Sequence, residues 1–177
     1  MKKLLLLLPA IVLLGACAEV KEPLPAPSAE SKSVKLTTSN STLTSDPLTE
    51  AKQVSLDIQG KEEKYTFEFS AGCSLHSTYD EFVLKDEQYL KSVSTYKVDR
   101  LVIDYMSKKG LSFDVKDANN QSVSSHESTV ATEHSGADDY GEVLEFPING
   151  TAWSLVNTNT GKAGTCLYSV TVIFEME

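Results

Sequence analysis

The alternation of apolar and polar residues constrains the fold of this chain more than any other feature. From about residue 51 onward, several short segments alternate with a period of two. Because successive side chains of a β-strand point to opposite faces, this period predicts strands. The last segment is the clearest, with one expected face formed by Cys166, Tyr168, Val170, Val172 and Phe174. Thr171, Ile173 and Glu175 are among the residues expected on its other face.

The alternating segments are short and are separated by polar turns, lying at 54–58, 65–69, 98–105, 111–115, 143–148, 151–157 and 166–174. Asn119-Asn120 predicts a turn, and Asn149-Gly150 predicts a hairpin, because these residues accept a positive φ. Such a pattern suits sheets with one packed face and one solvated face. We therefore expect a mainly β protein, an antiparallel, jelly-roll-like β-sandwich over residues 51–177.

One segment instead predicts a helix. Thr78 and Glu81 fit a capping box, and Phe82, Tyr89 and Val93 follow on one helical stripe. We expect one short helix over residues 79–91.

The first residues are typical of a targeting segment. Lys2 and Lys3 precede an apolar run over 4–14 that only Pro9 interrupts. Eleven helical residues rise ~16 Å, about half of the ~30 Å hydrocarbon core, so the run is too short to span a membrane. These features predict a signal peptide over residues 1–16.

The next residues point to a lipid anchor. Leu14-Gly15-Ala16-Cys17 resembles the lipobox of bacterial lipoproteins. The resemblance implies cleavage before Cys17, a diacylglyceryl thioether on its sulfur and an acyl chain such as palmitate on its amino group. Ala18 stands where an Asp retains such proteins in the inner membrane, which implies the outer membrane. The alternative is an ordinary secretory signal in which Cys17 is incidental.

Residues 17–50 predict a lipidated cysteine followed by a disordered tether. Four of the six prolines lie here, and Lys32 to Ser45 is mostly Ser and Thr. Such a composition buries too little apolar surface to offset the entropy of ordering. The alternative is that Val34 to Leu36, or Thr42 to Leu48, adds an edge strand to the domain.

Export would place the two remaining cysteines in an oxidising compartment. Cys73 continues the inward register of Tyr65, Phe67 and Phe69, and Cys166 shares the register of Val170. We expect a Cys73–Cys166 disulfide, with two free thiols or a redox pair as the alternatives.

Two features suggest ligand sites. Residues Ser124 to Asp139 gather imidazoles and carboxylates that could hold a divalent cation, namely His126, Glu133, His134 and Asp138. Their spacing matches neither HExxH nor an EF-hand, and a solvated loop without a cofactor is the alternative. Trp153, the single tryptophan, is a candidate ligand-binding residue, with core packing as its alternative.

The charge and the motifs narrow the function. The chain carries 16 basic and 25 acidic residues, a net charge of -9, which argues against nucleic-acid binding. Removing the signal peptide leaves a net charge of -11. No Gly-x-Ser-x-Gly elbow is present and only three histidines occur, so we expect no enzyme activity.

The stretch Gly164 to Val172 resembles the closing strand of bacterial pre-peptidase C-terminal β-sandwiches, which implies a jelly-roll-like appendage fold. We expect a noncatalytic outer-membrane lipoprotein that is held to the membrane by acyl chains on Cys17 and binds an envelope or extracellular protein or glycan. One alternative is an inhibitor or exclusion factor that blocks a cationic partner such as a lysozyme. Another is a hydrolase with an unrecognised site.

Overall fold

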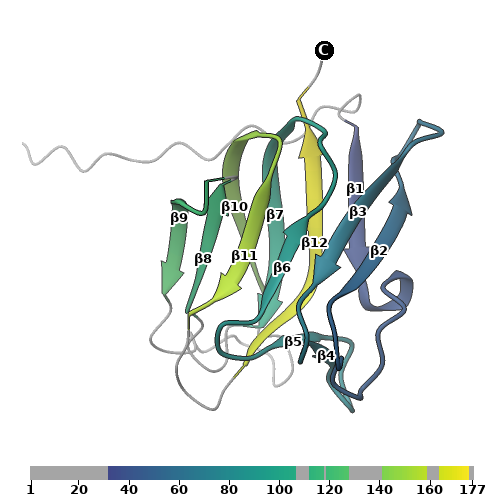
Figure 1. The fold of residues 1–177 in the computed structure, drawn as a ribbon, viewed down its shortest axis with the longest axis vertical. Coiled ribbons are helices and arrows are strands. Elements are labelled where there is room, and N and C mark those ends of the chain that lie inside the picture. Colours follow the sequence, from purple (N-terminus) through teal and green to yellow (C-terminus); the bar gives the residue numbers. More distant parts are fainter. Residues whose placement is uncertain (1–31, 107–111, 118, 128–140, 159–163, 176–177) are drawn as a thin grey trace, which may run out of the picture.

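Two antiparallel sheets packed face to face form the domain (Figure 1). The computed structural model describes residues 32–106, 112–117, 119–127, 141–158 and 164–175. Over these residues all strand pairs are antiparallel and no α-helix forms. The prediction of a mainly β, antiparallel sandwich is confirmed.

The first sheet centres on β12 (Thr165–Phe174), which pairs with three other strands. Its order is β10-β7-β12-β5-β4, and β1 also pairs with β12. The other strands are β10 (Gly141–Gly150), β7 (Val98–Met106), β5 (Phe82–Leu84), β4 (Ser74–Leu75) and β1 (Ser33–Thr37). A 3-10 turn, η1 (Thr38–Asn40), follows β1.

The second sheet has the order β2-β3-β6-β11-β8-β9. Its strands are β2 (Lys52–Asp57), β3 (Lys64–Phe69), β6 (Tyr89–Ser92), β11 (Trp153–Asn157), β8 (Ser112–Asp117) and β9 (Ser122–Glu127). Inward residues alternate with outward ones along these strands, as in the buried Tyr65, Phe67 and Phe69 of β3.

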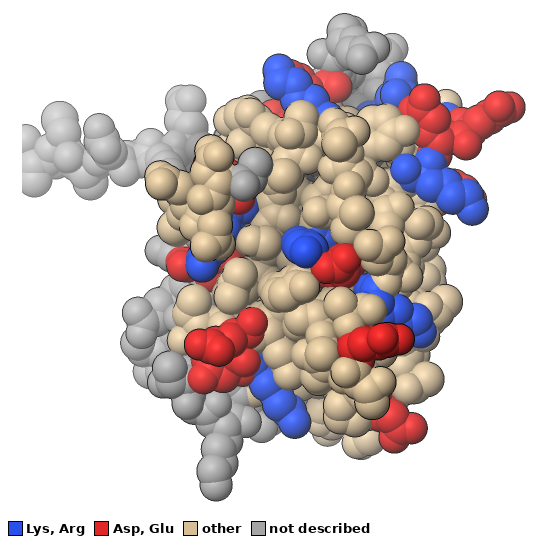
Figure 2. Space-filling model, viewed as in Figure 1, with Lys and Arg blue, Asp and Glu red and all other residues tan. Residues whose placement is uncertain are grey.

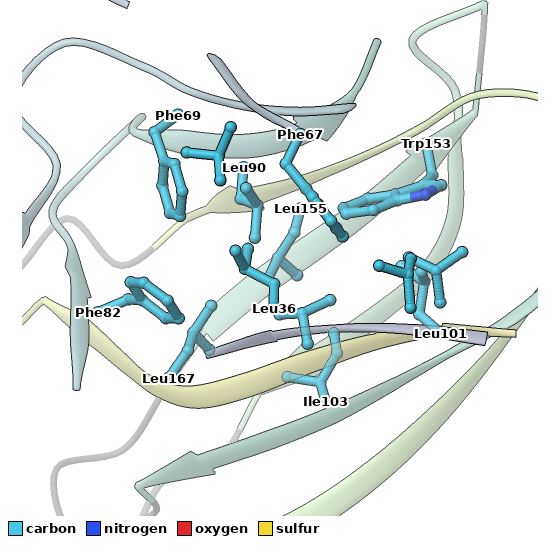
Figure 3. Packing of buried hydrophobic residues seen from close by; sticks show 14 of the residues in the cluster. Leu36, Phe67, Phe69, Phe82, Leu90, Leu101, Ile103, Trp153, Leu155 and Leu167 are labelled. Carbon is cyan, nitrogen blue, oxygen red and sulfur yellow. The ribbon is translucent and has the colours of Figure 1, made fainter. Parts of the chain in front are cut away.

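The core fills the space between the two sheets, where aromatic and aliphatic side chains from both interdigitate (Figure 3). Phe69 of the second sheet packs against Phe82 of the first, with ring centroids 5.3 Å apart. Each fully buried Leu or Phe contributes about 1.5–3 kcal/mol relative to an exposed one. This core holds the sheets together without a disulfide.

The folded domain begins earlier than the sequence predicted. β1 pairs with β12 from Ser33↔Ile173 to Thr37↔Ser169, and Val34 and Leu36 are buried. Leu43 is buried as well. The boundary at residue 51 is therefore wrong, because three apolar side chains in a Ser/Thr-rich stretch are enough to anchor an edge strand. The alternative edge strand at Val34 to Leu36 is the one that forms.

The helix predicted over 79–91 is also wrong. Phe82 to Leu84 forms β5 and Tyr89 to Ser92 forms β6, with a turn between them. The β5 strand pairs with both β12 and β4, and these tertiary contacts override the local capping signal. The backbone N–H groups of Thr78 and Tyr79 donate instead to His76 Nδ1.

Two expectations about turns need correction. Asn149 has the predicted positive φ, 49°, but β10 and β11 belong to different sheets, so no hairpin forms there. The chain instead crosses from the first sheet to the second. The expected loop from Ser124 onward begins as a strand, because Ser122 to Glu127 forms β9 and pairs with β8. The turn at Asn119-Asn120 joins β8 to β9, and Asn120 has a φ of 60°.

The sandwich has two distinct ends. One, here called the loop end, is formed by residues 38–51 and 70–81 and by the turn 85–88; it lies at the bottom of Figure 1. The opposite end holds the turn 58–63, residues 93–97 and both ends of the described chain. There Gln59 N donates to Ser33 O at 3.1 Å, and Phe174 N donates to Lys32 O at 3.0 Å. The segment that leads back to Cys17 therefore leaves from the end opposite the loop end.

Candidate binding surface at one end of the sandwich

The structure contradicts the predicted disulfide, because Cys73 and Cys166 are not joined. Thr165 and Leu167 point into the core, so Cys166 between them points to the outer face. A β-bulge between Leu167 and Ser169 reverses the alternation that the sequence implied. Cys73 is buried instead in the core, 3.4 Å from Ser70 Oγ, and burial raises the pKa of its thiol. The same bulge turns Tyr168 outward.

Trp153 is a core residue and not a ligand-binding one. Its side chain is 2% exposed, and Nε1 donates to the Tyr65 hydroxyl at 2.9 Å. The Tyr65 hydroxyl in turn donates to Ser92 Oγ at 2.8 Å. Burial raises the pKa of Tyr65 to about 12. The Trp153 indole, the Tyr65 hydroxyl and the Ser92 hydroxyl therefore form one chain of hydrogen bonds.

The predicted metal-binding loop is represented by its first residue alone. His126 lies in β9, where it pairs with Phe113. Glu133, His134 and Asp138 lie outside the described residues, as does Cys17. Within the described residues, no three His, Cys, Asp or Glu side chains come together as a metal site.

The side chains of a polar cluster on the outer face of the second sheet form hydrogen bonds and an ion pair with one another. Glu68 accepts hydrogen bonds from Gln53 at 3.0 Å and Tyr89 at 3.1 Å, and it pairs with Lys91 at 2.8 Å. The bonds from Gln53 and Lys91 lower the pKa of Glu68, and the bond to Glu68 raises the pKa of Lys91. Figure 2 shows such blue and red side chains next to one another on this face. Because these charges already have partners, the cluster does not indicate a missing ligand.

Backbone hydrogen bonds hold the segments of the loop end together. Leu48 N donates to Cys73 O at 2.9 Å, and Gly72 N donates to Leu48 O at 2.7 Å. The turn 85–88 is fixed to β11, because Glu87 N donates to Asn157 O at 3.0 Å. Asn157 Nδ2 then donates to Leu84 O at 2.9 Å. Loops from distant parts of the sequence thus form one continuous surface.

Charge is unbalanced on this surface. Residues 38–51 and 70–88 contain six carboxylates and one lysine, and the ammonium of the adjoining Lys52 donates to Thr42 O at 2.7 Å. Five of the carboxylates are exposed, and none of the five forms an ion pair with another described residue: Asp46, Glu50, Asp80, Asp86 and Glu87. Two carboxylates of the opposite end are paired, Glu63 with Lys61 at 3.5 Å and Glu175 with Lys97, whereas Glu62 forms no ion pair with another described residue. In the lower part of Figure 2, red side chains lie apart from one another, and blue side chains lie next to some of them.

An exposed aromatic ring stands among these carboxylates. Tyr79 is 59% exposed, and its ring centroid lies 4.9 Å from that of His76. His76 Nδ1 accepts the backbone N–H groups of Thr78 at 3.2 Å and Tyr79 at 3.3 Å. His76 N also donates to Glu81 O at 2.9 Å, closing the loop. The ring of Tyr79 is therefore held in a fixed position while most of its surface faces solvent.

Glu81 is the least expected residue of the loop end. Its side chain is 1% exposed. It lies next to Phe82, which pairs with Leu167, and so it is a neighbour of Tyr168. Burial raises the pKa of Tyr168 to about 12, and the charge of Glu81, a side-chain hydrogen bond with Glu81 and the charge of Asp104 act in the same direction. The Tyr168 hydroxyl is therefore the polar group that lies beside the buried carboxyl group of Glu81.

Backbone strain accompanies the charge. Glu87 has a φ of 60°, a left-handed conformation in which Gly or Asn is normal and Glu is rare. Strained residues of this kind are more frequent at functional sites than elsewhere. The turn thus keeps a carboxylate at a position where glycine would be the more stable choice.

Sequence reasoning missed this surface. Its carboxylates are separated by up to about 40 residues and belong to a stretch that was predicted to be partly tether and partly helix. The available signal was the acidity of 78–88, which holds four carboxylates and one lysine if Glu81 is included. Without the hydrogen bonds that join Leu48 to Cys73 and Glu87 to Asn157, that signal did not indicate a surface.

The fold places the protein in the class of two-sheet antiparallel β-domains. Comparison with known proteins does not assign it to a family. No family model and no curated protein matches the sequence. Solved structures with similar folds include the K1 cleaved adhesin domain of Lys-gingipain from Porphyromonas gingivalis W83, with 11% identity, a TM-score of 0.44 and coverage of 81% of this chain and 99% of that one.

The K2 cleaved adhesin domain of Lys-gingipain shares 11% identity at a TM-score of 0.38, over 79% of this chain and 88% of that chain. A glycoside hydrolase family 43 arabinoxylan arabinofuranohydrolase from Bacillus subtilis shares 13% identity at a TM-score of 0.44, over 74% of this chain and 28% of that chain. These values describe β-rich folds and transfer no activity. Among the described residues, no helix is long and apolar enough to cross a membrane.

Proposed function

We propose that this protein is a lipid-anchored lipoprotein of the cell envelope, whose β-sandwich is a noncatalytic binding domain. The observation that carries the proposal is Leu14-Gly15-Ala16-Cys17 directly after a basic start and an apolar run of signal-peptide length. Several acyl chains on one residue give a stable anchor, since each buried CH₂ contributes ~0.8 kcal/mol.

The position of the chain's ends supports this arrangement. Ser33 lies at the end of the sandwich that also holds Gln59 and Lys97, and the loop end lies at the far side. Fifteen residues separate Cys17 from Ser33, and at ~3.5 Å each they span at most ~50 Å. An anchor at Cys17 would leave the loop end pointing away from the bilayer, where a partner can reach it.

The binding role is supported by the loop end itself. It presents the exposed ring of Tyr79, which packs against His76, and aromatic residues are enriched at recognition surfaces. The net charge of -11 expected after processing also disfavours close contact between the domain and anionic headgroups.

Cys17→Ser tests the anchor. Cells expressing this variant and growing with an alkyne-labelled palmitate should yield an unlabelled protein that leaves the membrane fraction. Cys166→Ser is the matched control, because it removes a thiol from the folded domain and should keep both the label and the membrane association. Label or membrane partition that persists in Cys17→Ser would overturn the proposal.

A further inference from the structure

We infer that two copies of this protein associate through β2, an edge strand of the second sheet. The two β2 strands pair antiparallel about a two-fold axis, which joins the second sheets of both copies into one. This association goes beyond the proposed binding role and does not require the lipid anchor. Its evidence is the side of β2 that is not paired with β3, here called the β2 edge, and the self-complementary order of the residues along it.

The backbone of the β2 edge offers a row of hydrogen-bonding groups. Ile58 N donates to Glu63 O at 3.0 Å, which continues the β2–β3 ladder, and bonded residues alternate along an antiparallel strand. Even-numbered residues of β2 therefore bond to β3, whereas the N–H and C=O groups of Gln53, Ser55 and Asp57 face away from it. These groups have no hydrogen-bond partner among the described residues. The edge, on the right of Figure 1, is thus a template for another strand.

The side chains along this row leave the backbone uncovered. Gln53 Nε2 donates to Glu68 at 3.0 Å, and Ser55 Oγ bonds to Thr66 Oγ1 at 2.8 Å. Asp57 pairs with a lysine of β3 at 3.7 Å. Because all three partners belong to β3, these side chains are held on the side away from the β2 edge.

Other edge strands carry devices that prevent pairing. Asn40 covers β1, since its Nδ2 donates to Lys35 O at 2.9 Å and its Oδ1 accepts from Thr37 N at 2.8 Å. β10 contains Pro147 and a register shift, the β8–β9 pair has a shift as well, and β4 has only two residues. By contrast, β2 pairs with β3 over six residues without a shift and without a proline. Its one lysine, Lys52, stands at the first position.

The residue order of β2 favours a second copy of the chain as the occupant. With the two Ser55 residues opposite each other, Gln53 lies opposite Asp57 of the other copy, and Val54 lies opposite Leu56. An amide then meets a carboxylate, a hydroxyl meets a hydroxyl, and apolar side chains meet on the inner face. Such matched cross-strand pairs stabilise a sheet.

Neighbouring registers match less well. A register centred on Asp57 would place two carboxylates opposite each other, and one centred on Val54 would place Lys52 opposite Leu56. A register centred on Leu56 would need Gln59 N, which already donates to β1. Charge and polarity thus select the register centred on Ser55.

Two anchored copies can adopt this arrangement. Gln59 N donates to Ser33 O at 3.1 Å, so each tether leaves the domain beside residue 59. In the selected register, residue 59 of one copy lies about level with residue 51 of the other, so the two exits are about eight residues, or ~26 Å, apart along the strands. Tethers of up to ~50 Å reach one bilayer from both exits. The two loop ends then point in opposite directions along the membrane, where both stay open to a partner.

Sedimentation of the full chain carrying Cys17→Ser tests the association. At about 0.5 mM protein, a concentration suited to the weak pairing of so small a contact, we expect a monomer–dimer equilibrium. Ser55→Pro removes one outward N–H without breaking the β3 ladder, and it should lower the association constant ~10-fold or more. Lys35→Pro is the matched control, because it removes an N–H from the covered edge of β1, and it should leave the association constant unchanged.

Thermal unfolding of each variant confirms that it is folded. A parent protein that stays monomeric at about 0.5 mM would overturn the inference. Equal weakening by Ser55→Pro and Lys35→Pro would also overturn it, because the effect would then come from the fold and not from the β2 edge.

Cysteine trapping tests the register even where a proline variant fails to fold. In the full chain carrying Cys17→Ser and Cys166→Ser, Ser55→Cys should form an intermolecular disulfide when diamide oxidises the two thiols, because the opposing Cα atoms lie ~5.5 Å apart. Gln53→Cys should be trapped only when it is mixed with Asp57→Cys. Trapping of Gln53→Cys alone, or of no variant, would overturn the inference.

Discussion

Removing the Tyr65 hydroxyl tests the account of the core. Tyr65 is fully buried, and its oxygen accepts from Trp153 Nε1 at 2.9 Å and donates to Ser92 Oγ at 2.8 Å. Tyr65→Phe keeps the ring contacts with Phe67 and Phe174, at centroid distances of 5.0 Å and 5.4 Å. It leaves the indole N–H without that partner, and a buried unpaired donor costs about 1–3 kcal/mol. We expect the free energy of unfolding to fall by about 2 kcal/mol.

The assay is urea unfolding followed by the fluorescence of Trp153, the single tryptophan, in the Cys17→Ser protein. For a domain of this size, a loss of about 2 kcal/mol lowers the melting temperature by roughly 5–10 °C. Tyr79→Phe is the control, because that ring is 59% exposed, and it should change stability by less than about 0.5 kcal/mol. Equal stability of Tyr65→Phe and the parent would refute the buried hydrogen-bonded chain.

The same residue gives the pH dependence. The pKa of Tyr65 is raised to about 12 in the folded state, above its ordinary value near 10. The unfolded chain therefore loses this proton first, so the stability from Tyr65 is present below pH 10 and is lost as the pH rises toward 12. Two pKa units correspond to about 3 kcal/mol, and Tyr65→Phe should remove that part of the alkaline loss. An unchanged alkaline profile would contradict this assignment.

Three further predictions follow from the corrected fold and the loop end. Leu36→Ala, at a fully buried site of β1, should destabilise the protein by about 2–4 kcal/mol. Lys35→Ala, at an exposed site of the same strand, should cost less than about 0.5 kcal/mol. Equal effects of the two substitutions would show that residues 33–37 are a tether and not a strand of the domain. Glu87→Gly should stabilise the protein by about 0.5–1 kcal/mol, because the φ of Glu87 is 60°; a loss of stability would show that the strain is absent. A thiol reagent should detect two free thiols, Cys73 and Cys166, in unreduced, denatured Cys17→Ser protein. Detection of no free thiol would show that the two cysteines form a disulfide.

Much of the fold was predictable because period-two alternation survives wherever one sheet face packs on the core. β3, with Tyr65, Phe67 and Phe69 inward, follows the rule directly. The errors arose where pairing partners decide the outcome. The bulge after Leu167 reversed the face of Cys166, and pairing with β12 made a strand of Phe82 to Leu84 despite a helix-capping signal.

The candidate surface was less predictable than the fold. Asp46 and Glu87 contribute to one end of the molecule only because backbone hydrogen bonds join their loops to Cys73 and Asn157. The burial of Glu81 depends on tertiary placement, which residue spacing does not encode. For Trp153 the sequence did not decide between two roles, because a single tryptophan after a turn signal suits a ligand site or a core equally well.

The central claim is that the folded domain is held at a membrane by a lipidated Cys17. Mass spectrometry of the N-terminal peptide from membrane-extracted protein tests it most directly. The account predicts a mature chain that starts at Cys17 and carries a diacylglyceryl group on sulfur and an acyl group on nitrogen. A mature chain with an unmodified Cys17, or one that retains Met1 to Ala16, would contradict it.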